Sequence, residues 1–154
     1  MTPEQKLEQL GLVLPKTPVP IANYVPWRFA GPLLFLSGQG PKLADGSYSV
    51  GRLGLTADVA KGYDDARLTG LQLLAVAKVA LGELSRIEAV VKLLGMVNAE
   101  PEFSDHPKVI NGCSDLFVEV LGDVGKHARS AIGVGSLPNR MTVEIEAILL
   151  VKAN

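Results

Sequence analysis

The chain has 154 residues, enough for one compact domain with its own core. Its formal net charge of −1 offers no basic field to a phosphate backbone, which argues mildly against a nucleic-acid partner. Hydrophobic residues make up 47% of the chain and aromatic residues only 5%, so Leu, Val, Ile and Ala must supply most of the core volume.

The cysteine content and the apolar runs bear on compartment. The single cysteine, Cys113, excludes an internal disulfide framework and suits a reducing compartment. The first ten residues lack a positive run followed by an apolar core, so they do not resemble a signal peptide. The longest apolar run, near Leu71–Leu81, contains Lys78 and is too short to span a bilayer. We therefore expect a soluble cytoplasmic protein with no membrane partner.

The N-terminal segment reads as a short helix followed by an extended stretch. Thr2 can cap the helix with Pro3 at its first position, and Gly11 can end it. Prolines at positions 15, 18 and 20 are expected to keep Leu14–Ile21 extended and non-helical. We interpret residues 1–20 as an appendage on the surface and residues 21–154 as a single domain.

Two strands and a loop are predicted next. The strands are expected at Tyr24–Arg28 and Leu33–Ser37, with a turn at Gly31-Pro32 between them. The polar segment Lys42–Arg52 is expected to form a loop.

A long helix is expected from a cap at Thr56 to about Leu81, where Gly82 stops it. Apolar residues recur in it at helical spacing. Gly62 and Gly70 weaken the helix but permit close approach to a sheet.

A central strand and a second helix follow. The mostly apolar run Ile87–Val97 predicts the strand. Ser104 or Asp105 can cap the helix, with Pro107 in its first turn and Gly122 at its end. Cys113 falls on the apolar stripe of this helix, where a buried structural thiol is the favoured interpretation over a nucleophile.

The segment His127–Val151 predicts two strands joined by a turn at residues 136–139. In the second strand, Met141–Val151, apolar and other residues alternate, so Glu144 and Glu146 share one face. In the first strand Arg129 shares a face with small residues, namely Ala131, Gly133 and Gly135. If the two strands pair directly, Arg129 lies near one of the glutamates; if another strand intervenes, the charges can meet only in a cleft.

The predicted order is strand-strand-helix-strand-helix-strand-strand. This order suggests an α+β fold with one mixed sheet and both helices on one face. Another subunit is expected to cover the other face, because the chain supplies no third long helix.

Several residues are candidates for chemistry. Arg129 suits a carboxylate because of its planar donors, although a surface or structural Arg is the more frequent case. A glutamate of the second strand can orient or deprotonate a water, although a solvated strand face is again the more frequent case. His106 and His127 have no companion at metal-ligand spacing, so we expect no metal site. The glycine clusters do not open a helix after a strand, so we expect no dinucleotide loop.

Taken together, these motifs resemble the Rid family of YjgF-type reactive-intermediate deaminases, also known as endoribonuclease L-PSP proteins. Residues 127–130 read His-Ala-Arg-Ser, residues 137–138 Leu-Pro, and residues 143–148 Val-Glu-Ile-Glu-Ala-Ile. Upstream, Asn23–Val25 and Leu36–Gln39 are similar to the family's N-terminal and S-G-Q segments, and Asn111 matches the helix asparagine. The resemblance covers about residues 20–152.

The resemblance implies a chorismate-mutase-like fold that forms a homotrimer with a central barrel and clefts between neighbouring subunits. It implies that Arg129 binds the carboxylate of a 2-imino or 2-enamino acid and that Glu144 positions the hydrolytic water, without metal or cofactor. It further implies that the pocket is lined or supported by Tyr24, Ser37, Gly38, Asn111 and Ala131. Ala131 stands where the branch typified by RidA has Cys, and the Lys42–Arg52 loop is longer than usual. This is therefore a divergent branch.

Three functions follow as hypotheses. The leading one is a cofactor-independent imine/enamine deaminase. The alternative is a non-catalytic module that binds small carboxylate metabolites in the same cleft. A ribonuclease, suggested by the family's name, has little support from the charge balance.

Overall fold

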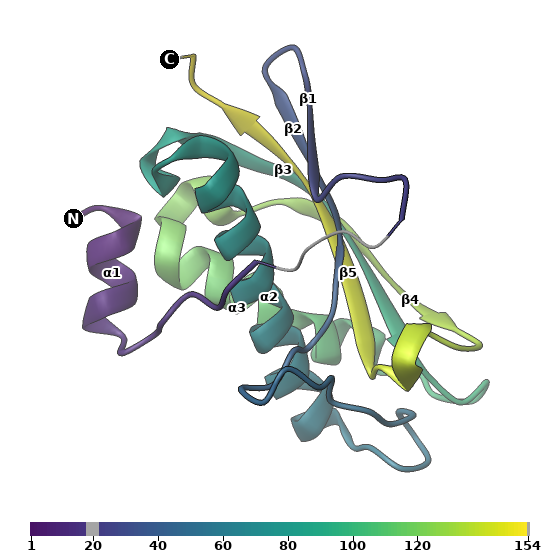
Figure 1. Cartoon of the computed structure of the whole chain (residues 1–154). Helices are drawn as coiled ribbons and strands as arrows, with labels where there is room; N and C mark the ends of the chain where they lie inside the picture. Colours follow the sequence, from purple (N-terminus) through teal and green to yellow (C-terminus); the bar gives the residue numbers. More distant parts are fainter. Residues whose placement is uncertain (18–21, 154) are drawn as a thin grey trace.

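One five-stranded sheet organises the chain in the computed structural model, which describes residues 1–17 and 22–153 (Figure 1). The helices are α1 (Pro3–Gln9), α2 (Val59–Leu81) and α3 (His106–Leu121), with short 3₁₀ turns at Leu84–Arg86, Gly122–Gly125 and Pro138–Arg140. The strands are β1 (Trp27–Ala30), β2 (Leu33–Gln39), β3 (Ile87–Asn98), β4 (Ala128–Val134) and β5 (Val143–Val151). From β1 onward, the predicted order of elements is confirmed.

The sheet is mixed, with the strand order β1-β2-β5-β3-β4. Only β3 and β4 run parallel; the other neighbours are antiparallel. Because β3 lies between β4 and β5, the last two strands do not form a hairpin. Leu93 of β3 pairs with Arg129 on one side and with Ala147 on the other. The second of the two predicted arrangements, an intervening strand, is the one that occurs.

Local capping chemistry fixes both ends of α2, with one correction to the prediction, whereas α3 begins after Asp105, whose side chain makes no capping hydrogen bond. Asp58 caps α2, and its carboxylate accepts from the backbone N–H of Lys61. Thr56, the expected cap, instead accepts from the backbone N–H of Arg52, so the cap prediction was wrong by two residues. Gly82 ends α2 as predicted, at a φ of 84° that favours glycine.

Both long helices pack on the same side of the sheet and against each other, as Figure 1 shows. Glycines bring their axes together. A Cβ on Gly70 would stand 2.9 Å from Leu116 Cδ2, and one on Gly112 would stand 2.0 Å from the backbone oxygen of Tyr63. Gly62 likewise faces Val109 of α3. The prediction that the α2 glycines serve an approach to the sheet was therefore wrong, because they serve the approach of the two helices.

Two strand starts differ from the predicted ones. β1 begins at Trp27 and not at Tyr24, because Pro26 has no N–H to donate to the ladder. β5 begins at Val143, while Met141 pairs with Val50 in an isolated bridge to the preceding loop. The residues before each strand still make backbone contacts to the sheet region, since Pro26 O accepts from the backbone N–H of Ser37 and Met141 bridges to Val50.

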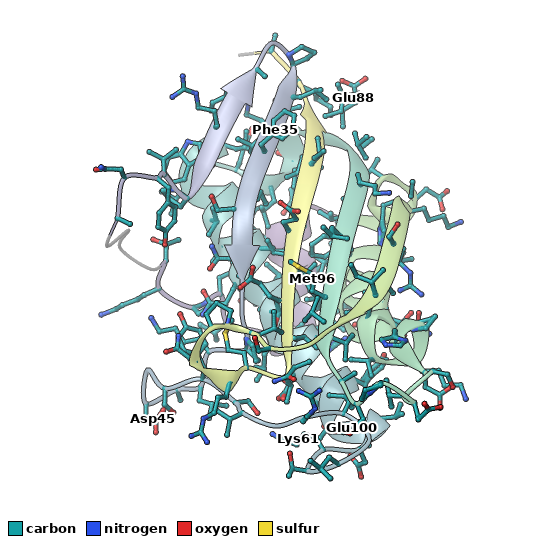
Figure 2. All side chains as sticks on the ribbon, turned by 90° about the vertical axis from the view of Figure 1, so that its right-hand side faces the viewer. Phe35, Asp45, Lys61, Glu88, Met96 and Glu100 are labelled. Carbon is teal, nitrogen blue, oxygen red and sulfur yellow. The ribbon has the colours of Figure 1, made fainter. Side chains whose placement is uncertain are left out.

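The two faces of the sheet differ in cover. The core lies between the sheet and the pair α2–α3, where Leu34, Leu93 and Ile145 are fully buried. The opposite face, seen in Figure 2, carries Phe35, which is 40% exposed, and Ile132, which is 44% exposed. No helix in residues 1–17 or 22–153 covers this open face.

The N-terminal helix α1 docks beside α3, away from the sheet (Figure 1). Thr2 caps it through a capping box, as expected, and Leu7 is buried in the main core. Glu4 accepts from Lys78 Nζ and from the backbone N–H of Leu84. The prolines at 18 and 20 lie outside the described residues, so the division at residue 20 stays a prediction. Within the described chain, no helix is both long and apolar enough to cross a membrane.

Candidate functional site

Arg129 projects from β4 toward α3, on the side of the sheet that the helices cover. Its Nη1 donates to Ser114 Oγ at 2.9 Å and its Nη2 to the backbone oxygen of Pro107 at 3.3 Å. Ala131 and Gly133 follow on the same side of the strand, because alternate residues share a face. A Cβ on Gly133 would stand 2.5 Å from His106 Nε2, so only glycine leaves this imidazole its place.

A hydrogen-bonded chain continues from Arg129 into the protein. Ser114 Oγ lies 2.9 Å from His127 Nε2, and His127 Nδ1 lies 2.6 Å from the backbone oxygen of Gly125. Burial lowers the pKa of His127, the bond to Gly125 opposes this, and the Arg129 charge lowers the pKa further. The imidazole is therefore neutral at physiological pH.

Asn111 lies on α3 one turn before Ser114, and the two side chains are half-buried on one helix face. We name the set Asn111, Ser114, Arg129 and Ala131 the cationic half-site. It lies at the β4 edge of the sheet.

Glu144 lies on the other, open face. Its carboxylate stands directly over Gly38, where a Cβ would lie 2.7 Å from Oε2. Burial raises the pKa of Glu144, and the neighbouring charge of Glu146 raises it further. Among the described residues the carboxylate has no hydrogen-bond partner that could offset this. Glu144 is thus a proton acceptor of more than ordinary basicity for a carboxylate.

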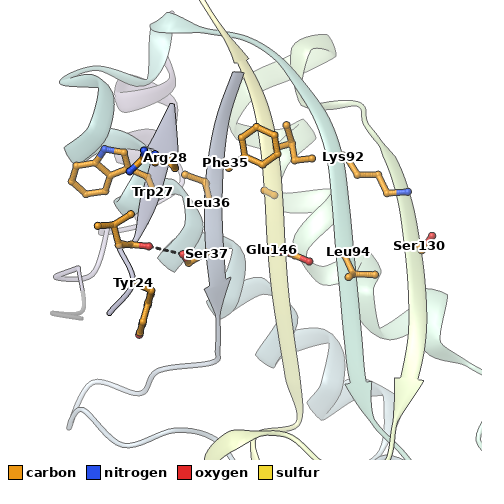
Figure 3. A pocket seen from close by; sticks show the side chains of 13 residues that line it. Tyr24, Trp27, Arg28, Phe35, Leu36, Ser37, Lys92, Leu94, Ser130 and Glu146 are labelled. Atoms are coloured by element: carbon orange, nitrogen blue, oxygen red, sulfur yellow. Dashed lines mark hydrogen bonds between the residues drawn. The ribbon is translucent and has the colours of Figure 1, made fainter. Parts of the chain in front are cut away.

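A groove of about 630 Å³ runs along the same open face (Figure 3). Tyr24 and Ser37 line one side, Lys92 and Ser130 the other, and Glu146 lies between them. Ser37 Oγ donates to the backbone oxygen of Val25 at 2.6 Å, which fixes the segment before β1 against β2. We name Tyr24, Ser37, Gly38 and Glu144 the acidic half-site; Glu146 is its neighbour in the groove.

The predicted site residues therefore divide between two faces. Arg129, Ala131 and Asn111 lie on one side of the sheet, and Tyr24, Ser37, Gly38 and Glu144 lie on the other. Sequence reasoning missed Ser114 and the link from His127, which was considered only as a metal ligand. The spacing held a signal, because Ser114 follows Asn111 by one helical turn and His127 precedes Arg129 by two residues on an extended chain.

Two further possibilities considered from the sequence were a nucleophilic Cys113 and a metal site. Cys113 is fully buried, and burial raises the pKa of its thiol far above the usual range, so the structural interpretation is confirmed. In residues 1–17 and 22–153 there is no cluster of three His, Cys, Asp or Glu side chains that could hold a metal ion.

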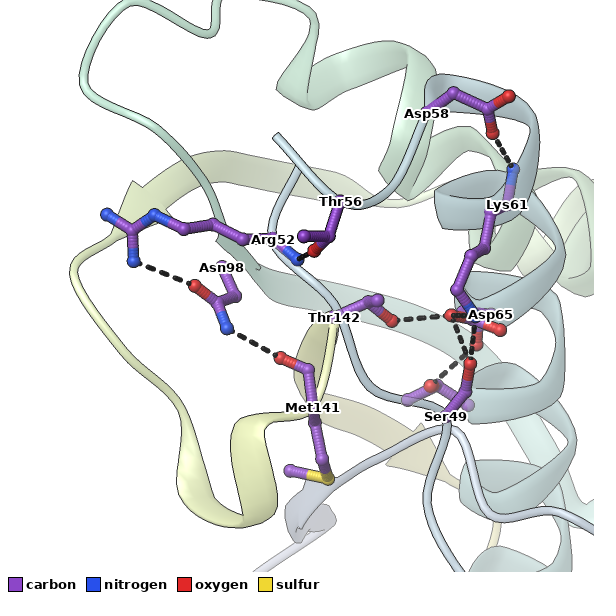
Figure 4. A network of polar contacts seen from close by, with 10 residues as sticks. Ser49, Arg52, Thr56, Asp58, Lys61, Asp65, Asn98, Met141 and Thr142 are labelled. Atoms are coloured by element: carbon purple, nitrogen blue, oxygen red, sulfur yellow. Dashed lines mark hydrogen bonds and ion pairs between the residues drawn. The ribbon is translucent and has the colours of Figure 1, made fainter. Parts of the chain in front are cut away.

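A second polar network fastens the loop before α2 (Figure 4). The buried carboxylate of Asp65 accepts from Ser49 Oγ at 2.8 Å and from Thr142 Oγ1 at 2.6 Å, and Lys61 completes the group. Arg52 bonds to Glu100 and to the backbone oxygen of Gly135. The Lys42–Arg52 loop is thereby tied to α2 and to the turn after β4, which makes this network structural.

Comparison with known proteins identifies the class. Residues 4–145 match the model of the family described as "YjgF/chorismate_mutase-like, putative endoribonuclease". The chain therefore belongs to this family, to which its C-terminal motifs pointed, and its single mixed sheet with the long helices on one face is the fold of that family.

Individual relatives give a finer placement. Protein TCP17 of Trypanosoma cruzi is 42% identical over 93% of this chain and 90% of its own. The crystal structure of Atu1372 from Agrobacterium tumefaciens, a protein of unknown function, is 44% identical with a TM-score of 0.90, and the match covers 98% of this chain and 94% of that one. E. coli TdcF, solved with bound serine, is more distant: 27% identical, TM-score 0.62, with 90% and 94% of the chains covered.

Proposed function

We propose that the protein hydrolyses reactive 2-imino and 2-enamino acids to 2-keto acids and ammonia, as a cofactor-independent deaminase in the cytoplasm. The site is formed in a homotrimer, where the cationic half-site of one subunit meets the acidic half-site of the next. One observation carries this proposal: Arg129 and Glu144 lie on opposite faces of the same sheet, so neither half is complete within one chain.

The cationic half-site supplies the substrate anchor. Arg carries five N–H donors in a planar fork, and Arg129 uses Nη1 on Ser114 and Nη2 on Pro107. Three donors remain for a ligand carboxylate, enough for a bidentate contact. Hydrogen bonds to charged groups contribute roughly 1.5–3 kcal/mol each, so such a contact suffices to hold a small acid.

The acidic half-site supplies the proton acceptor. Glu144 takes a proton from water while the water oxygen bonds to the imine carbon, and it passes this proton to the imine nitrogen to give the carbinolamine. Glu144 then transfers the hydroxyl proton of the carbinolamine to the amino nitrogen as the C–N bond breaks, which releases the keto acid and ammonia. An enamino acid first tautomerises to the imine. Holding the carboxylate on Arg129 fixes the distance between the imine carbon and the water, which lowers the entropic part of the barrier.

Relatives support the carboxylate part of this proposal. The TdcF structure holds serine, an amino acid with the same α-carboxylate as the proposed substrates. The same support fits the alternative function, a binding module for small carboxylates without turnover. The ribonuclease reading gains nothing from a chain of net charge −1.

The deciding experiment measures keto-acid and ammonia release from enzymatically generated 2-aminoacrylate, with and without the protein. Faster release than the uncatalysed background supports the deaminase. Binding of pyruvate without faster release would support the binding module instead, and neither binding nor release would overturn both.

Arg129 variants test the anchor. We expect Arg129→Ala to lose about 100-fold or more in pyruvate affinity and in kcat/KM, from the loss of two charge-assisted hydrogen bonds. Arg129→Lys should keep the charge but recover little, because it lacks the planar fork. A large drop in melting temperature of Arg129→Ala, with no acid binding even by the wild type, would make the Arg a purely structural residue.

A further inference from the structure

Behind the cationic half-site lies His127, which is linked to Arg129 through the hydroxyl of Ser114. We propose that neutral His127, acting through the hydroxyl of Ser114, is a positioning residue that fixes the Arg129 guanidinium for carboxylate binding. This inference rests on the proposed function, because it assigns Arg129 the carboxylate.

The direction of each hydrogen bond follows from the groups present. The backbone oxygen of Gly125 can only accept, so His127 Nδ1, 2.6 Å away, carries the proton. In a neutral imidazole Nε2 is then an acceptor, and its donor among the described residues is the hydroxyl of Ser114. With its proton directed to His127, Ser114 Oγ presents its lone pairs to Arg129 Nη1 at 2.9 Å.

The imidazole stays neutral for physical reasons. It is half-buried and lies next to the positive charge of Arg129, and both effects lower its pKa. Protonation would turn Nε2 into a donor, and Ser114 Oγ would then accept from both His127 and Arg129, with no acceptor for its own hydrogen in residues 1–17 and 22–153. The fixed tautomer thus gives the guanidinium one well-defined orientation, with its second contact to the Pro107 backbone as the other support.

The family resemblance assigned roles to Arg129, Asn111 and Glu144 but none to Ser114 or His127, although His127 lies within the motif at residues 127–130. Ser114 is on α3, and His127 immediately precedes β4. The geometry therefore adds a second layer behind Arg129, and a misplaced anchor would cost substrate affinity even with the Arg intact.

Two side-chain replacements separate the two contacts of the imidazole. His127→Gln reaches as far as Nε2 and can still accept from Ser114, whereas His127→Asn can donate to Gly125 but stops short of Ser114. We expect His127→Gln to bind pyruvate within about twofold of wild type, and His127→Asn and Ser114→Ala to bind about three- to tenfold more weakly, the range expected for one hydrogen bond. The double variant Ser114→Ala/His127→Asn should be no weaker than either single variant. Wild-type affinity in His127→Asn, or an additive double variant, would overturn the proposal.

A spectroscopic test works without any ligand. The chain has two histidines, so His106→Gln leaves His127 as the only imidazole and also serves as the binding control. In this background ¹⁵N chemical shifts should show the Nδ1–H tautomer, and Arg129→Ala should raise the pKa of His127. An Nε2–H tautomer, or a His127 pKa that Arg129→Ala does not change, would contradict the proposed hydrogen-bonded link from His127 through Ser114 to Arg129. If the wild type neither binds pyruvate nor accelerates keto-acid release, the proposed function is overturned, and the tautomer measurement then tests the hydrogen-bonded link from His127 to Arg129 by itself.

Discussion

The two sides of the sheet differ in the hydrogen-bond donors that they offer to a carboxylate. On the helix-covered side, Asp65 is 4% exposed and is surrounded by hydroxyl donors and a lysine. On the open side, Glu144 is half-buried with another carboxylate nearby and no donor among the described residues, and its pKa is raised.

This difference separates stability from reactivity. A buried carboxylate that accepts several hydrogen bonds has its polar atoms satisfied and holds the loop against α2. A partly buried carboxylate that lacks them is easier to protonate, which is the property needed to take a proton from water. The closed face is thus organised for packing, and the open face keeps a basic group available for a ligand.

The largest expected effect is on the closed face, from Gly112→Ala. The new methyl would meet the backbone oxygen of Tyr63 at 2.0 Å, and backbone cannot rotate away as a side chain can. We expect α2 and α3 to be forced apart and the free energy of unfolding to fall by about 3 kcal/mol or more, measured by urea denaturation. Gly70→Ala is the matched control, because its methyl meets mainly side-chain atoms of Leu116 and Cys113 and a helical Ala gains about 1 kcal/mol over Gly. Equal losses would show that the helix contact does not depend on a close backbone approach.

On the open face, Glu144→Gln should lower turnover by about 10²–10⁴-fold while pyruvate binding persists, because the proton acceptor is gone. The thermal stability of the variant, in contrast to its turnover, should not fall near neutral pH. A carboxyl whose folded-state pKa is raised adds stability below its unfolded pKa, and that stability is lost as pH rises through the folded pKa. The variant should therefore melt no lower than wild type near neutral pH, with the difference vanishing in acid. Unchanged turnover would leave Glu146 or a backbone carbonyl to orient the water.

The cover of the open face is tested by Phe35→Asp. Phe35 is 40% exposed in the single chain, so a charge there costs the monomer little but would be buried in a trimer. We expect light scattering to show a trimer for wild type and monomers for the variant at micromolar concentration. Val79→Asp, on the outer surface of α2 and 56% exposed, should leave the trimer intact. A monomeric wild type would refute the shared site along with the trimer.

The smallest expected effect comes from Glu146→Gln. Burial alone keeps the pKa of Glu144 above the ordinary 4.5, and the charge of Glu146 adds to it. Removing that charge should lower the pKa of Glu144, so the acidic limb of the pH–rate profile should move to lower pH without disappearing. A limb that moves to higher pH, or not at all, would indicate that the limb reports another group.

The sequence by itself determined the local features. Alternation along Val143–Val151 assigned Glu144 and Glu146 to one face, because the side-chain period of a strand is two. Gly82 ended α2 and Gly122 ended α3, because both adopt a positive φ that favours glycine. The C-terminal motifs identified the family before any fold was known.

Tertiary structure alone decided what meets what. The placement of β3 between β4 and β5 separates Arg129 from Glu144, and strand pairing between segments so far apart in sequence leaves no local trace. The same holds for the α2 glycines, whose partner is α3 and not the sheet, and for Ser114, which meets His127 and Arg129 only because α3 packs beside β4. Local periodicity determines which residues share a face, whereas the partner of that face depends on packing energies summed over the whole core.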